Sequence, residues 1–207
     1  MIQDKKKLVV CGIEFVYLYL FGIIVAFIGW VAENFAKLVT TGIIDSRFHL
    51  LPFISPYALI PLAFHLLLKD PDDIEVFGKK IFKEKNNLMS NIVSFIEICS
   101  LVFLGELVVG NLWEIISGVE LWNYSNMPCS VTQYAGLIPT LGYGGGAYLI
   151  FKFIYVPFLK FIREKVNFDV AKLITSTLGV IIVLDTLFMM FQIIEFNVAP
   201  VYWTIKF

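Results

Sequence analysis

The chain has 207 residues, of which 58% are hydrophobic and 16% charged, and its formal net charge is -1. Soluble domains average about 45–50% apolar and about 25% charged residues, so this composition excludes an ordinary soluble domain. The near-neutral charge gives no reason to expect a nucleic-acid partner, and the 3 cysteines show neither a zinc-site nor a disulfide spacing. We therefore expect an all-α bundle of transmembrane helices surrounded by membrane lipids.

Long apolar segments recur along the chain, and each is a predicted membrane span. A helix needs about 20 apolar residues to cross about 30 Å of hydrocarbon. By this criterion the sequence predicts about five spans, at about 8–35, 50–68, 92–118, 134–162 and 171–196. We expect residues 1–207 to form a single transmembrane domain, with a charged cytoplasmic loop at 69–91.

The second predicted span differs from the others because it contains Pro52, Pro56 and Pro61. Proline lacks a backbone donor and breaks the helical hydrogen-bond ladder. Carbonyl groups freed in this way inside a membrane need protein or water as partners. The second span is therefore predicted to be kinked or re-entrant.

The distribution of Lys and Arg predicts the orientation. Cations gather before the first span, between the second and third, and between the fourth and fifth. They are Lys5, Lys6, Lys7, Lys69, Lys79, Lys80, Lys83, Lys85, Lys160, Arg163, Lys165 and Lys172. By the positive-inside rule these alternate connections are cytoplasmic, with Lys37 and Arg47 in the first external connection as a modest exception. We expect a multi-pass protein of the cell membrane with the amino terminus in the cytoplasm and the carboxy terminus outside.

Acidic residues within the predicted spans are the main candidates for a functional site. A charge at the bilayer centre costs about 2.5–3.5 kcal/mol or more, so such groups usually face the bundle interior. The acids in question are Glu33, Glu106, Glu114, Asp185 and Glu195. Glu33 and Glu195 lie near span ends, where hydrogen bonding to a neighbouring helix or to headgroups explains them as well.

Helical spacing places several of these acids beside small or polar residues. In the third span one face carries Glu106, Gly110, Trp113 and Ser117, and the adjoining stripe carries Asn111, Glu114 and Gly118. In the first span Gly22, Ala26, Gly29 and Glu33 share a face. Small residues let helices approach closely, so Glu33 is predicted to point into a helix interface.

Two other features have weaker functional interpretations. Gly142 and the run 144–146 in the fourth span favour tight helix packing over a substrate contact, and the run lacks the Gly-Lys-Ser/Thr ending of a phosphate loop. His49 and His65 have no metal-type spacing. We expect neither a metal site nor a cofactor.

The third span and the loop after it resemble a known family. Residues 111–114 read Asn-Leu-Trp-Glu, Gly118 follows, and residues 121–125 read Leu-Trp-Asn-Tyr-Ser. This pattern resembles the WE…G…WDYS signature of the CmpB-like family of ABC-transporter permeases. Gly29, Trp30 and Glu33 are similar to the family's GW-x-x-E in its first helix.

The resemblance covers roughly residues 21–158, with a weaker similarity at 47–56. Asn123 stands where the family usually has Asp, which removes a charge from that loop, and the segment 69–91 is longer than is typical. The glycine that the family has before the second-helix proline is missing here. Membership would imply transport, and because the chain has no ATP-binding motif, an energised transporter would need a separate ATPase subunit. The other expected partner is a further copy of the same chain, in a homo-oligomer.

The first functional hypothesis is a transporter or permease-like subunit whose interior acids bind a cationic or protonatable solute, or relay protons. Broken helices and midplane polar groups are typical of such sites. The residues predicted to bind substrate are Trp30, Glu33, Glu106, Asn111, Trp113, Glu114, Trp122 and Tyr124.

The alternative is an intramembrane enzyme that acts on a lipophilic substrate. Residues 111–114 also resemble the N-x-W-E segment of the small integral-membrane terpene cyclases, in which an acid protonates an alkene or epoxide. Glu114 would be the catalytic acid and Asp185 a second carboxylate, with Trp113 and Trp30 stabilising the cation. A scaffold without a substrate is the third possibility.

Overall fold

The computed structural model describes residues 8–10, 13–68, 75–76, 79–80 and 88–207. The predicted amino-terminal cations and most of the charged loop 69–91 lie outside the described residues. The orientation of the termini therefore stays a prediction.

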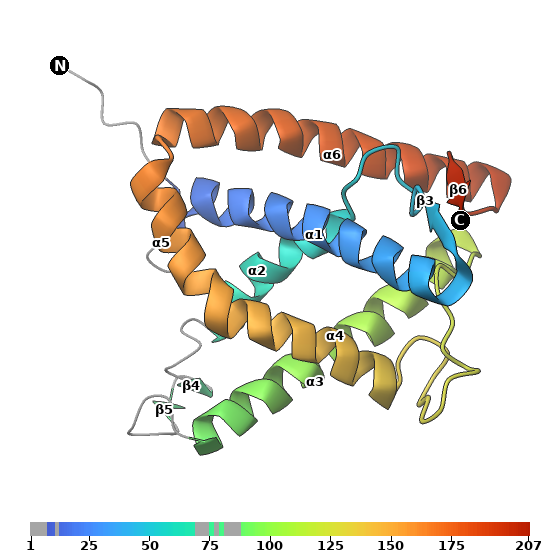
Figure 1. The fold of residues 1–207 in the computed structure, drawn as a ribbon, viewed down its shortest axis with the longest axis horizontal. Helices are drawn as coiled ribbons and strands as arrows, with labels where there is room; N and C mark the ends of the chain where they lie inside the picture. Colours follow the sequence, from blue (N-terminus) through green and yellow to red (C-terminus); the bar gives the residue numbers. More distant parts are fainter. Residues whose placement is uncertain (1–7, 11–12, 69–74, 77–78, 81–87) are drawn as a thin grey trace. The chain divides into compact units, whose positions relative to one another are not determined.

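The described residues form a predominantly helical protein (Figure 1). The helices are α1 Phe15–Thr41, α2 Ser55–Leu68, α3 Leu88–Ser117, α4 Leu137–Leu149, the π-helix η1 Ile150–Tyr155, α5 Val156–Lys165 and α6 Phe168–Phe196. The strands are all short and form three antiparallel pairs: β1 Val9–Val10 with β2 Ile13–Glu14, β3 Ile43–Asp45 with β6 Thr204–Lys206, and β4 Glu75–Val76 with β5 Lys79–Lys80. The prediction of an all-α fold is confirmed.

Within the described part of the chain, 4 helical segments are long and apolar enough to cross a membrane: Phe15–Thr41, Leu88–Ser117, Leu137–Lys165 and Phe168–Phe196. The third of these runs through α4, η1 and α5 without interruption. Ser55–Leu67 is a shorter apolar helix. Four of the predicted spans thus correspond to full-length helices, and the proline-containing second span is helical only from Ser55 onward.

Local backbone geometry explains why α1 differs from its predicted range. Strands β1 and β2 pair with each other just before Phe15, so the helix begins later than the hydropathy predicts. At the other end Gly42 has a φ of 67° and its N–H donates to the carbonyl of Leu38. This left-handed glycine cap ends the helix.

The fold divides into two compact units, which are described separately. The first unit comprises Met1–Leu67, Pro157–Met189 and Pro200–Phe207. The second comprises Leu68–Val156 and Met190–Ala199.

In the first unit the small-residue face of α1 packs against α2. A Cβ atom on Gly22 would lie 2.2 Å from the carbonyl oxygen of Ala58, and one on Gly29 would lie 2.5 Å from Cδ2 of Tyr57. Ala26, between these glycines, is completely buried. The predicted interface on this face of α1 is confirmed.

The segment 43–54 runs back along α1 without forming a helix. The N–H of Asp45 donates to Oδ1 of Asn34 (2.9 Å), and the N–H of Ile54 donates to the carbonyl of Ala26 (3.3 Å). At 1.5 Å per residue, the segment returns about 22 Å from the end of α1 toward its middle. The second span therefore consists of a non-helical half followed by the short helix α2.

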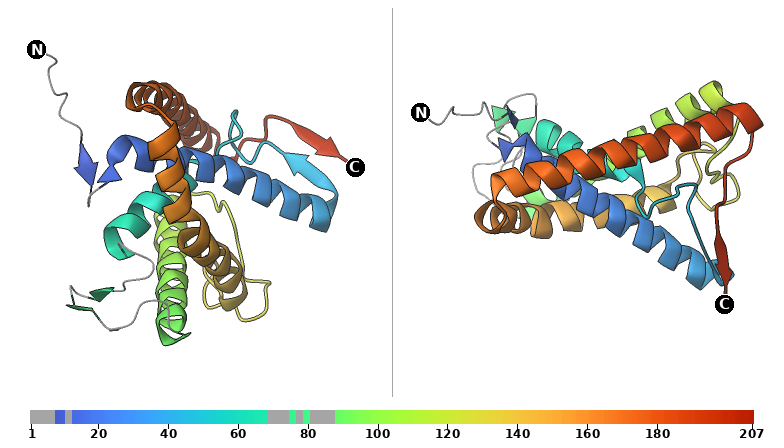
Figure 2. Two further views of the ribbon diagram at one scale, coloured as in Figure 1. Left: turned by 60° about the vertical axis from the view of Figure 1, so that its left-hand side comes forward. Right: turned by 90° about the horizontal axis from the view of Figure 1, so that it is seen from above.

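Strand pairing satisfies part of the backbone of this non-helical half. β3 pairs with β6 in an antiparallel ribbon, visible side by side in Figure 2. The N–H of Ser46 donates to the carbonyl of Trp203 (3.2 Å), and Ser46 Oγ accepts the N–H of Tyr202 (3.1 Å). Irregular backbone among apolar spans is tolerated where other parts of the protein supply such partners.

The second unit is built on α3 and α4, which pack side by side (Figure 1). A Cβ atom on Gly144 of α4 would lie 3.0 Å from Cα of Cys99 on α3. Further along the same helical segment, Lys152 contacts the side chain of Asn91, closer to the start of α3. These contacts show that the two helices run antiparallel.

Candidate functional site

Polar side chains gather at two centres, one in each unit. The Asp185 centre, in the first unit, consists of Glu33, Arg47, His49, Tyr57 and Asp185. The Glu106 centre, in the second unit, consists of Glu106, Tyr124 and Tyr143.

Asp185 holds the non-helical half of the second span. Its carboxylate accepts the N–H of Leu50 at 2.9 Å and that of Leu51 at 3.4 Å. His49 Nδ1 lies 3.3 Å from Asp185 Oδ2, and both side chains are only 5% exposed. Because two backbone donors and an imidazole surround this carboxylate, it connects α6 to the segment that precedes α2.

Glu33 is neutralised within the same unit. Its Oε2 accepts hydrogen bonds from the guanidinium of Arg47, with Nε at 2.9 Å, and its Oε1 accepts one from Tyr57 Oη at 2.8 Å. Both carboxylate oxygens therefore have strong donors. Nearby, Trp30 Nε1 lies 3.4 Å from the carbonyl oxygen of Ser46, and its ring centroid is 6.1 Å from that of Trp203.

In the second unit Glu114 fastens the loop that leads to α4. Its Oε2 accepts hydrogen bonds from Gln133 Nε2 at 2.9 Å and from Tyr134 Oη at 2.8 Å. Trp122 Nε1 donates to the carbonyl of Tyr134 at 3.1 Å. The ring of Tyr134 also fills the space above Gly110, where a Cβ atom would lie 2.4 Å from it.

The Tyr134 hydroxyl gives the protein a predicted sensitivity to alkaline pH. Burial, with a further contribution from Glu114, raises the pKa of Tyr134 to about 12 from 10.0. In the unfolded chain this phenol loses its proton at lower pH, so its contribution to stability is complete below pH 10.0 and is lost as the pH rises toward about 12. Thermal unfolding of the wild type should therefore shift to lower temperature across this range. Tyr134→Phe should shift less, and equal shifts would contradict the assignment.

At the Glu106 centre one carboxylate oxygen has no hydrogen-bond partner in the part of the chain that the structure describes. Tyr124 Oη donates to Glu106 Oε1 at 3.2 Å. Glu106 Oε2 is buried and has no hydrogen-bond partner among the described residues, and the same holds for Thr140 Oγ1 and Trp113 Nε1. A buried polar group without a partner is costly, so the Glu106 carboxylate differs chemically from the fully bonded carboxylates described above.

Tyr143 lies on α4, which packs against α3 with Gly144 beside Cys99. Burial raises the pKa of Tyr124, and interactions with Tyr143 and Glu106, including a hydrogen bond to each, add to the shift.

The other predicted site residues are distributed as follows. The Asn111 side chain is exposed and its amide donates to the carbonyl of Leu107 in the preceding turn (2.6 Å). Glu114 and Asp185, the pair proposed for catalysis, belong to different units. A site shared by these two carboxylates stays a prediction. Among the described residues there is no group of three or more His, Cys, Asp or Glu side chains arranged to hold a metal ion.

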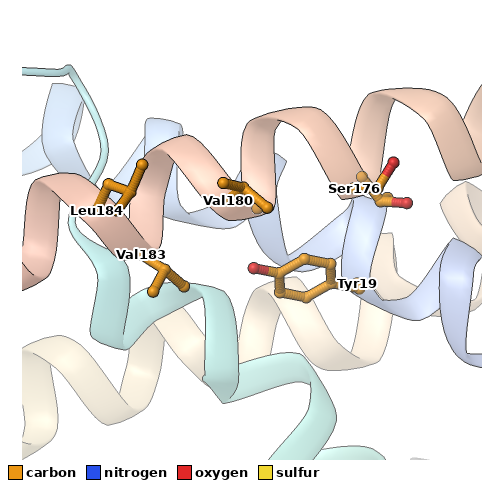
Figure 3. Close-up of a pocket in the computed structure, with 7 residues that line it drawn as sticks. Tyr19, Ser176, Val180, Val183 and Leu184 are labelled. Carbon is orange, nitrogen blue, oxygen red and sulfur yellow. The ribbon is translucent and has the colours of Figure 1, made fainter.

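The first unit also contains a groove whose lining includes none of the residues of the two centres (Figure 3). It has a volume of about 340 Å³ and is lined by Tyr19 of α1 and by Thr175, Ser176, Gly179, Val180, Val183 and Leu184 of α6. The hydroxyl groups of Thr175 and Ser176 are bonded to carbonyls of their own helix. Its lining is mostly apolar and contains no carboxylate.

Comparison with known proteins identifies the family. Residues 19–190 match the family described as "Putative ABC-transporter type IV" (CmpB). The chain belongs to this family. No curated protein and no solved structure matches it. Membership in the CmpB family, together with the four long apolar helices, identifies the chain as a multi-pass membrane protein of a transporter-like kind.

Sequence reasoning missed several residues at the two centres of this CmpB-family protein. Tyr143 was not predicted to be a site residue because it lies in a glycine-rich segment whose small residues dominate the pattern. Arg47 was noted only for its charge and as the start of the weaker family similarity, and His49 only as a weak metal candidate. No local sequence pattern indicates the Glu33–Tyr57 contact, because it joins residues 24 positions apart.

Proposed function

We propose that this CmpB-family chain is a membrane transporter subunit that binds a cationic or protonatable solute at Glu106. The observation that carries the proposal is the buried oxygen Oε2 of this residue, which lacks a hydrogen-bond donor among the described residues. Acidic groups within membrane spans commonly mark ion and substrate pathways. A cation or an N–H donor would supply the missing partner.

The bonding of the other acids supports the choice of Glu106. Glu33 is bonded to Arg47 and Tyr57, Asp185 to the backbone of Leu50 and Leu51, and Glu114 to Gln133 and Tyr134: each has its donors within the protein. A solute would have to displace these donors. At Glu106 it would instead meet an oxygen that has no donor among the described residues.

The family supports association with a separate ATPase subunit and with membrane lipids. An ATP-driven cycle would then use the partner for hydrolysis and this chain for the solute pathway. A homo-oligomer is the other assembly proposed. The amino terminus is proposed to be cytoplasmic and the carboxy terminus outside, following the positive-inside rule.

The enzyme alternative, with Glu114 and Asp185 as acid–base groups, has less support. A general acid must reach a substrate atom within hydrogen-bond distance. Both carboxylates already accept two hydrogen bonds from protein donors. Glu106 has an acceptor position open to a substrate, and this difference favours the transporter.

The test is equilibrium binding of radiolabelled methylammonium, a small cationic probe, to the purified chain in lipid nanodiscs. Glu106→Gln keeps the size of the side chain and removes its charge, so affinity is expected to fall by about tenfold or more, comparable to the loss of a charge-assisted hydrogen bond. Glu97→Gln, on the same helix, is the matched control and should bind as the wild type does. If both variants bind equally well, the proposal is wrong.

A further inference from the structure

Hydrogen bonds connect Glu106 to a partly exposed residue on α4. Tyr124 Oη donates to Glu106 Oε1 at 3.2 Å, and Tyr124 is also hydrogen-bonded to Tyr143. The Tyr143 side chain is 45% exposed, whereas Glu106 Oε2 is buried. The hydroxyl groups of Tyr143 and Tyr124 therefore connect a partly exposed side chain to a buried carboxylate.

The loop holds Tyr124 in place for this connection. Its backbone N–H donates to the carbonyl of Gln133 at 2.7 Å, and its carbonyl accepts the N–H of Met127 at 2.8 Å. Gln133 in turn is bonded to Glu114 on α3. The hydroxyl of Tyr124 is thus fixed against Glu106 by contacts that do not involve the carboxylate itself.

We infer that Glu106 is a proton-binding site and that its proton is exchanged through the hydroxyl groups of Tyr124 and Tyr143. The inference rests on the proposed function, because it names H⁺ as an ion used at the same site. It assigns Tyr124 and Tyr143 as relay groups and Glu106 as the group that changes charge.

The relay conserves protons at each oxygen. A proton that arrives at Tyr143 Oη forms a new O–H bond there while the original phenol proton passes to Tyr124 Oη. Tyr124 at the same time gives its own proton to Glu106 Oε1. Both phenols end neutral, the carboxylate becomes a carboxylic acid, and rotation of the two hydroxyl groups restores the starting arrangement.

The chemistry of the neighbours favours a proton over a metal ion. Hard divalent cations take about six or more oxygen ligands, usually with several carboxylates. Among the described residues, the titratable neighbour of Glu106 is the phenol Tyr124, which in turn neighbours Tyr143. The next acids on α3, Glu97 and Glu114, are each at least about two helical turns away. A single carboxyl group with phenol neighbours can bind one proton but offers few ligands to a metal.

Burial supports the relay role of Tyr124. It raises the pKa of this phenol, with Tyr143 and Glu106 adding to the effect. The phenol therefore stays neutral at physiological pH and passes protons by hydrogen-bond exchange, without forming a phenolate.

Infrared difference spectroscopy of the purified chain in lipid vesicles, labelled with ¹³C-glutamate, tests the inference. A carboxylic-acid band that appears on acidification should be absent in Glu106→Gln and present in Glu97→Gln. After a rapid pH jump the band should form about tenfold or more slowly in Tyr124→Phe and Tyr143→Phe, because a phenylalanine ring cannot transfer a proton. Tyr148→Phe is the matched control, since Tyr148 lies on the same helix and its ring packs edge-on against Phe95.

Two results would overturn the inference: a band that persists in Glu106→Gln, or band formation in both relay variants at the rate of Tyr148→Phe. Each variant is first checked for folding by its helical circular dichroism. Tyr143→Phe serves as the second relay variant because the partly exposed side chain contributes less to packing.

If Glu106→Gln loses methylammonium binding but no Glu106 band exists, the proton inference fails and the proposed function stands. If the Glu106 band and its slow formation in the relay variants are observed while Glu106→Gln binds methylammonium as the wild type does, the proposed solute binding fails and the proton inference stands.

Discussion

Replacing Asp185 by alanine is expected to destabilise the protein by about 3 kcal/mol or more, the usual cost of removing one partner from a buried charged interaction. The substitution removes the acceptor for the N–H groups of Leu50 and Leu51 and leaves His49 without its carboxylate neighbour. These groups belong to non-helical backbone among apolar helices, where substitute partners are scarce. Thermal unfolding in detergent measures the loss.

Amide hydrogen exchange localises the effect of this substitution. Residues 50 and 51 should exchange faster in Asp185→Ala, while the core of α3 should exchange as in the wild type. Glu195→Ala, an exposed acid near the end of the same helix, is the control and should change stability little. Unchanged exchange at 50 and 51 in Asp185→Ala would show that the carboxylate does not hold this segment.

Replacing Gly22 by alanine is expected to destabilise the protein by about 2 kcal/mol, within the range found for overpacked cores. The new Cβ atom would lie 2.2 Å from the carbonyl oxygen of Ala58, which is backbone and cannot rotate away. Helices α1 and α2 would have to separate, and the closely packed surface between them would loosen. The change in the unfolding midpoint of the purified protein measures this.

Gly146→Ala is the matched control for Gly22→Ala. Both glycines lie within apolar helices, but no described atom outside the local backbone lies within 4 Å of a Cβ atom on Gly146. Alanine favours the helix by up to about 1 kcal/mol over glycine, so this variant should be as stable as the wild type or slightly more so. If both variants were equally stable, close α1–α2 packing at Gly22 would not hold.

The spans and one interface could be predicted from the sequence because they depend on local periodicity. Hydropathy located the long apolar helices, and the spacing of Gly22, Ala26 and Gly29 placed small residues on one face of α1. The prolines at 52, 56 and 61 correctly indicated that the second span would be broken. Where the helix ends differ from the prediction, as at Gly42, a backbone conformation rather than hydropathy decides the boundary.

The partners of the acids could not be predicted in the same way. The hydrogen bond between Leu50 and Asp185 joins residues 135 positions apart, so no local sequence pattern indicates it. Glu106 and Glu114 looked equivalent as acids on one apolar helix. Their difference arises from the following loop, which supplies Gln133 and Tyr134 to one carboxylate and Tyr124 to the other.

The non-helical half of the second span has a consequence for biogenesis. Some of the groups that bind its backbone, namely Asp185, the carbonyl of Trp203 and strand β6, come from residues that the ribosome adds much later than 43–54. Until those residues emerge, part of this stretch has amides and carbonyls that lipid cannot satisfy. We therefore expect the nascent chain to keep this stretch in the translocon or at the water interface until α6 and β6 have been synthesised.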